Sequence, residues 1–121
     1  MDNDNIENSH QEMVDKLCKS GESIMSSMTS HKMHLLHMAS KLCSEAGELM
    51  DAIGKNSFYN KDLDMANVIE ELGDMEFYMH GIRKDLGIIR ADTLYHNMNK
   101  LDRRYSEGYS DKAAHARTDK T

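Results

Sequence analysis

Apolar residues recur at intervals of three and four over most of the chain, which is the spacing of helices that bury one face. Four runs carry this pattern, and they span Ile6–Met28, Leu35–Ile53, Met65–Leu86 and Asp92–Leu101. The sequence therefore predicts an all-α protein in which residues 1–121 form a single domain, a four-helix bundle.

Residues that favour helix ends separate these runs. Thr29 and Ser30 offer a break and a new N-cap, and Asp64 offers the cap of the third helix. Gly54 and Gly87 are suited to end the second and third helices. We therefore predict a loop over residues 54–63.

The two ends of the chain carry weaker patterns. Residues 1–5 are polar, and we expect them to be loose. Apolar residues become sparse from Tyr105 onward, which predicts an irregular tail over 105–121 with a short helix near Ser110–Arg117.

Composition supports helices and indicates a small core. The chain has 121 residues, 39% of them apolar, with 11 Met and no Pro or Trp. Met residues are expected to fill a flexible core. A chain of this length with few aromatic residues is expected to complete its core by pairing with another subunit.

Charge and cysteine usage exclude several classes of protein. The formal net charge of −6 disfavours a nonspecific nucleic-acid binder, and no apolar stretch approaches the ~20 residues of a membrane span. The acidic start does not resemble a signal or transit peptide. Cys18 and Cys43 do not have the spacing of a zinc-finger site. We expect both cysteines to be reduced and to lie in the core of a cytoplasmic protein.

Paired carboxylates carry the most specific signal. At ~100° per residue, Glu45 and Glu48 lie on one flank of the second apolar stripe, and Glu71 and Asp74 lie on the matching flank of the third. Antiparallel packing would bring the four together, and their repulsion calls for a cation such as Mg²⁺ or Mn²⁺, with substrate phosphates alongside.

The pattern leaves a second interpretation open. Acidic pairs at this spacing are common on solvated helix surfaces. The same pattern does not exclude Asp51, Glu70 and Glu76 from a carboxylate site.

Several segments around these carboxylates resemble a known family. Ser44–Leu49 resembles the EExxE motif of MazG-type nucleotide pyrophosphohydrolases, and Glu70–Asp74 resembles their ExxD motif. Four further blocks resemble the short bacterial and phage members: Leu36-His37, Asp64–Asn67, Asn97–Tyr105 and Gly108–Ala114. The resemblance covers about residues 31–117.

The resemblance implies a function and a set of metal ligands. Members of this all-α group hydrolyse nucleoside triphosphates between the α- and β-phosphates, usually with Mg²⁺, as dimers or dimers of dimers. The implied metal-binding and catalytic residues are Glu45, Glu48, Glu71 and Asp74. Ser44 replaces the leading Glu of the first motif. Glu70 is an alternative carboxylate for orienting water, but it points away from the cluster.

Other polar residues are candidates for contacts with the substrate. His37 and Lys41 lie on the same side of their helix as Glu45 and Glu48. Asn67 can form a hydrogen bond either to a base or ribose of the substrate or to a neighbouring helix. His31 and His34 are expected at the surface. Tyr78 is expected to order a ligand or to pack at an interface. Four polar residues can share one face of the fourth predicted helix, where they would bind phosphate or, as cations, only stabilise the C-terminal end of the helix. They are Asn97, Lys100, Arg103 and Arg104.

These observations lead to one principal hypothesis. We expect a Mg²⁺-dependent nucleoside triphosphate pyrophosphohydrolase, a homodimer or homotetramer with no nucleic-acid or membrane partner. Two alternatives remain: hydrolysis of a signalling nucleotide such as ppGpp, and a bundle that binds a nucleotide or a partner without turnover.

Overall fold

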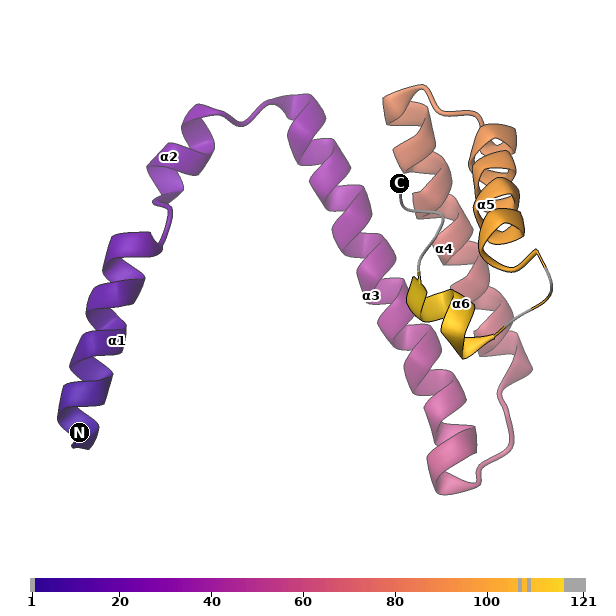
Figure 1. The fold of residues 1–121 in the computed structure, drawn as a ribbon, viewed down its shortest axis with the longest axis horizontal. Coiled ribbons are helices and arrows are strands. Elements are labelled where there is room, and N and C mark those ends of the chain that lie inside the picture. Colours follow the sequence, from indigo (N-terminus) through magenta and orange to yellow (C-terminus); the bar gives the residue numbers. More distant parts are fainter. Residues whose placement is uncertain (1, 107, 109, 117–121) are drawn as a thin grey trace. The chain divides into compact units, whose positions relative to one another are not determined.

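The computed structural model describes residues 2–106, 108 and 110–116. Over these residues the chain forms six α-helices and no strand, which confirms the all-α prediction (Figure 1). The chain divides into two units after Met33, and each is considered by itself. No described helix combines the length and the apolar character needed to cross a membrane. The four-helix bundle remains a prediction.

The first unit contains α1 (Asn3–Leu17) and α2 (Gly21–Ser26). The prediction of one continuous helix is wrong here, because the Ser20 side chain accepts a hydrogen bond from the Ser23 N–H and starts a second helix. Residues 3–5, expected to be loose, are helical because Asp2 caps α1 and accepts from the Asn5 N–H. Neither helix buries a residue.

Helix α3 (Ser30–Tyr59) begins where the sequence predicted and ends later. The Thr29 hydroxyl accepts a hydrogen bond from the Lys32 N–H at 3.1 Å, which marks the predicted break. Gly54 does not end the helix, so the predicted loop over 54–63 is wrong over its first half. One Gly inside a helix costs only about 1 kcal/mol, and the chain leaves the helix at Asn60, whose φ is 52°.

Helix α4 (Met65–Leu86) has both of its predicted ends. The Asp64 carboxylate accepts a hydrogen bond from the Asn67 N–H at 3.1 Å. Gly87 adopts the left-handed conformation with φ 67°, and its N–H donates to the carbonyl oxygens of Arg83 and Lys84.

The remaining helices are α5 (Arg90–Arg104) and α6 (Asp111–Ala116). Helix α5 is longer at both ends than the apolar pattern predicted, because nearly all of the residues added at its ends are polar and so carry no apolar signal. The short helix predicted near the C-terminus is confirmed as α6, and Arg117 lies outside the described residues.

Helices α3 and α4 lie side by side and antiparallel (Figure 1). His34 pairs with Asp85, and Met38 lies against Gly81, where an added Cβ would be 2.9 Å from the Met38 Sδ. These two contacts fix the register of the helix pair, because each step along α3 is matched by a step back along α4.

Burial is much lower than the apolar stripes predicted. Among the described residues, Ala52 is the one apolar residue that is buried, whereas Ile53, Leu72 and Leu86 are each more than 40% exposed. Cys43 and Cys18 are also exposed, so their predicted place in a core is wrong for the single chain. Most of the Met residues do not fill a core either; the most exposed are Met13, Met25, Met50, Met65 and Met98. The helices of a single chain offer the apolar stripes too little opposing surface to cover them.

Candidate metal centre and adjoining cleft

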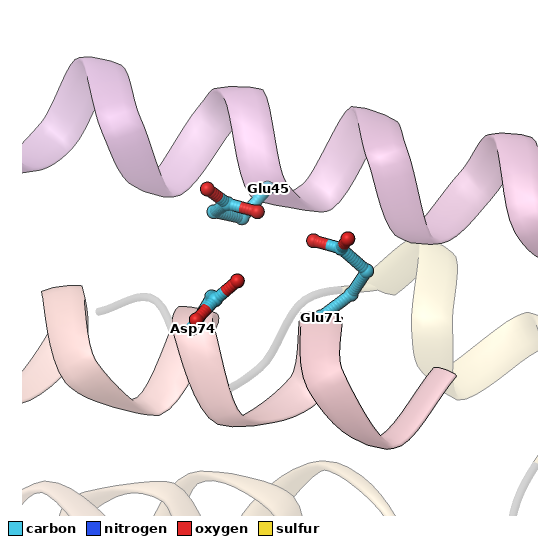
Figure 2. Close-up of side chains that lie close together, drawn as sticks. All are labelled: Glu45, Glu71 and Asp74. Atoms are coloured by element: carbon cyan, nitrogen blue, oxygen red, sulfur yellow. The ribbon is translucent and has the colours of Figure 1, made fainter. Parts of the chain in front are cut away.

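Three carboxylates from two helices meet on the α3–α4 pair. Glu45 projects from α3, and Glu71 and Asp74 project from α4 toward it (Figure 2). One oxygen of each lies within 4.8 Å of the others. The register accounts for this meeting, because two turns beyond Met38 on α3 is Glu45, and two turns before Gly81 on α4 is Asp74.

Two of these carboxylates are buried without a full set of partners. Glu45 is 8% exposed and Glu71 is 6% exposed, while Asp74 is half-buried. The Oε2 atoms of Glu45 and Glu71 are buried and have no hydrogen-bond partner. A buried carboxylate oxygen without a partner is costly, so the site requires either a proton or a cation.

In the absence of a cation, a proton stabilises the site. A hydrogen bond to Glu45, burial, and the charges of Glu48 and Glu45 together raise the pKa of Glu71 from 4.5 to about 7. The neutral form of Glu71 is therefore favoured in the folded chain without metal. A bound divalent cation would reverse this preference, because it favours the ionised carboxylate.

This raised pKa predicts how stability depends on pH in the absence of metal. Between about pH 4.5 and 7 the folded chain holds a proton on Glu71 that the unfolded chain releases, so stability falls as pH rises. In EDTA, the melting temperature should be lower at pH 8 than at pH 5. The variant Glu71→Gln should have a flatter profile, since Gln stays neutral. The measurement is thermal unfolding at several pH values. The same decrease of melting temperature with pH in the wild type and in Glu71→Gln would contradict the prediction.

A cleft of about 450 Å³ adjoins the carboxylate cluster. Glu48 is exposed and lies at this cleft, where its charge and a hydrogen bond to Glu71 contribute to the raised pKa. Thus three of the four carboxylates predicted from the sequence form the cluster, and the fourth stands beside it. The described residues that line the cleft are Ser44, Gly47, Glu48, Asp51, Asn67 and Glu71.

Asp51 is a cleft residue that the sequence pattern did not separate from other surface acids. It follows Ser44 and Glu48 at helical spacing on α3, and it forms an ion pair with Lys55 at 3.3 Å. Glu70 is exposed and is not among the described residues that line the cleft. The helical spacing from Ser44 was the signal that could have identified Asp51.

The structure brings only one of the predicted substrate-binding residues to this cleft. Asn67 is half-buried there. His37 and Lys41 lie on α3 outside the lining residues described for the cleft. The same holds for the predicted phosphate-binding residues of α5, which are Asn97, Lys100, Arg103 and Arg104. The role of all seven in substrate binding stays a prediction.

Two residues outside the cleft have packing that the sequence left open. His34 is exposed as predicted, but it pairs with Asp85, which lies 51 positions along the chain and so gave no local signal. The Tyr78 ring packs edge-to-face against Phe77, with centroids 5.1 Å apart.

Comparison with known proteins identifies a family over most of the chain. Residues 33–108 match the sequence profile described as the MazG nucleotide pyrophosphohydrolase domain. The match includes all four predicted carboxylates and the cleft. No curated protein and no solved structure matches the chain.

Proposed function

Because the chain belongs to the MazG nucleotide pyrophosphohydrolase family, we propose that it hydrolyses nucleoside or deoxynucleoside triphosphates between the α- and β-phosphates. The products would be the nucleoside monophosphate and pyrophosphate, a reaction suited to control of the nucleotide pool. The observation that carries the proposal is the meeting of Glu45, Glu71 and Asp74, with two buried oxygens that lack hydrogen-bond donors.

The donor set fits a hard divalent cation. All three groups offer carboxylate oxygens, which suit Mg²⁺, and Mn²⁺ as a substitute, better than the softer metals that prefer nitrogen or sulfur. Glu45, Glu71 and Asp74 would hold the ion, with Glu48 beside them. When bound, Mg²⁺ would supply the positive charge that phosphate oxygens require.

The cleft residues supply the remaining chemistry. Attack of water on the α-phosphorus forms one P–O bond and breaks the bond to the bridging oxygen, which leaves with pyrophosphate. Glu48 and Asp51 line the cleft and can accept the proton that the water loses, a role that the Ser44 hydroxyl does not fill. The Asn67 amide can hydrogen-bond a base or ribose.

We further propose that the functional unit contains at least two copies of the chain. Exposed apolar side chains that share one face of α4 support this, because monomeric proteins rarely leave such residues contiguous and uncovered; they are Met65, Ile69 and Leu72. The basic residues of α5 do not line the cleft of their own chain. A second copy would allow Lys100, Arg103 or Arg104 to approach the cleft from the partner and to bind the triphosphate.

The proposed reaction predicts its first products. With Mg²⁺ and a deoxynucleoside triphosphate, pyrophosphate and the monophosphate should form together in equal amounts, without prior release of orthophosphate. Separate assays of pyrophosphate and orthophosphate distinguish these outcomes. EDTA should abolish the reaction. Orthophosphate as the first product would refute the proposal, and faster turnover of ppGpp in a nucleotide panel would assign a different substrate.

A further inference from the structure

A second cavity lies on the same helix pair, away from the carboxylate cluster. It has a volume of about 630 Å³, within the range of small-ligand sites. It lies where His34 and Met38 of α3 face the C-terminal half of α4, and Arg90 at the start of α5 completes it. None of its described lining residues belongs to the cleft beside the cluster. Met38 is seven residues, or about 10 Å of helix, from Glu45.

One wall of this cavity is apolar. Gly81 has no side chain to hold Met38 away from α4, since an added Cβ would come within 2.9 Å of the Met38 Sδ. Phe77 is 65% exposed and also lines the cavity, and its ring is held edge-to-face by Tyr78. Met38 and Phe77 thus offer a thioether and an aromatic ring against which a planar group can lie.

Cationic side chains outnumber acidic ones in the polar part of the cavity. Arg83, Lys84 and Arg90 line it together with two acids, Glu76 and Asp85, and Asp85 pairs with His34. The Arg83 Nε atom is buried and has no hydrogen-bond partner. A buried donor without an acceptor is costly, so this N–H favours a ligand that brings an acceptor into the cavity.

We propose that this cavity binds a small phosphate monoester that carries a planar ring, such as a nucleoside monophosphate. The ring lies against Met38 and Phe77, and the phosphate oxygens accept hydrogen bonds from Arg83, with Lys84 and Arg90 adding charge. The lining holds three cationic side chains against two acidic ones, and the dianion of a phosphate gains more from this excess than a singly charged carboxylate does. The proposal does not depend on the hydrolytic activity proposed above, because the cavity shares no described residue with the carboxylate site.

The test measures binding to the full-length chain in EDTA, so that the carboxylate cluster holds no cation. By calorimetry, deoxyadenosine monophosphate should bind with a Kd below ~1 mM, or roughly −4 kcal/mol. Inorganic phosphate alone and deoxyadenosine alone should each bind at least tenfold more weakly, because each lacks one half of the recognised structure. Equal binding of inorganic phosphate, or no binding of the monophosphate, would overturn the proposal.

Matched variants locate the site. Arg83→Met keeps the aliphatic stem and should weaken monophosphate binding at least tenfold, whereas Lys61→Met removes an exposed cation outside the cavity and should change nothing. Asp74→Asn should also leave this metal-free binding intact. Phe77→Ala, at an exposed position, should weaken binding of the monophosphate without changing the binding of inorganic phosphate. Loss of binding in Asp74→Asn with retention in Arg83→Met would place the ligand at the cluster and refute the proposal.

Discussion

Asp74→Asn should reduce pyrophosphate release by a factor of at least about 100 while the chain remains folded. The substitution preserves the shape of the side chain but removes one of the three anionic groups that meet between α3 and α4. A bound cation contributes several kcal/mol to stabilising charge on phosphate, and each 1.36 kcal/mol corresponds to a factor of about ten in rate. The measurement is kcat for pyrophosphate release over a series of Mg²⁺ concentrations.

The control for this variant is Asp62→Asn, the same chemical change at an exposed residue of the loop before α4. It should keep wild-type turnover. In EDTA, Asp74→Asn should unfold at the same temperature as the wild type or higher, because it relieves repulsion within the cluster. This separates loss of a ligand from loss of the fold. Wild-type turnover in Asp74→Asn would refute the assignment of the metal centre.

Glu48→Gln is a companion variant that examines the carboxylate beside the cluster. Glu48 is exposed, yet its charge and hydrogen bond contribute to the raised pKa of Glu71. Its neutralisation should reduce turnover as well, if it ligates the ion or accepts the proton of the attacking water. Unchanged kcat in Glu48→Gln would restrict the working site to the three clustered carboxylates.

Local chemistry explains which parts of the fold the sequence could predict. Asp64 and Gly87 set the ends of α4, because a side-chain cap and a left-handed glycine act within one turn. The first predicted helix was wrong for a related reason. Its apolar spacing continues through Ser20, and periodicity alone does not register the competing hydrogen bond from Ser23 to the Ser20 hydroxyl.

The candidate site shows the same division between local and distant information. Helical spacing placed Glu45 and Glu48 on one flank and Glu71 and Asp74 on another, and antiparallel packing then brought three of them together. Spacing within one helix does not determine the register between two helices. The pairing of His34 with Asp85 and the burial of the Arg83 Nε depend on which turn of α3 meets which turn of α4, so no run of neighbouring residues revealed them.

Burial was the property least accessible from the single sequence. The stripes correctly identified the residues that water disfavours, but Leu72 and Ile53 are about half and two-fifths exposed in one chain. Apolar periodicity reflects burial in the functional assembly. The exposure of these apolar residues in a single chain therefore supports the presence of a second copy. This proposal can be tested at defined positions.

Exposed apolar side chains share one face of the N-terminal half of α4, which we call the apolar face. Its members are spaced by four and three residues, so they lie along one side of the helix. Each is more than 40% exposed, and they are Met65, Ile69 and Leu72.

Ile69→Glu should dissociate the homodimer and reduce both stability and turnover. Covering a side chain of this size stabilises by about 1.5–3 kcal/mol, and a twofold interface contains it twice. Light scattering after size-exclusion chromatography should give twice the 13.8 kDa mass of one chain, or a higher even multiple, for the wild type and a single chain for the variant. The melting temperature of the wild type should rise with protein concentration, as expected when association stabilises the fold.

Ile89→Glu is the matched control for this last variant. Ile89 is 67% exposed, against 65% for Ile69, but it lies at the start of α5, outside the apolar face. The same new charge at the same exposure should therefore leave the dimer intact. A wild type that remains a single chain at every concentration would refute the proposed assembly. Dissociation by both variants would show that a general charge effect, not the apolar face, governs association. If only Ile69→Glu dissociates and its turnover falls in parallel, the apolar face is the surface that joins two copies into the working unit.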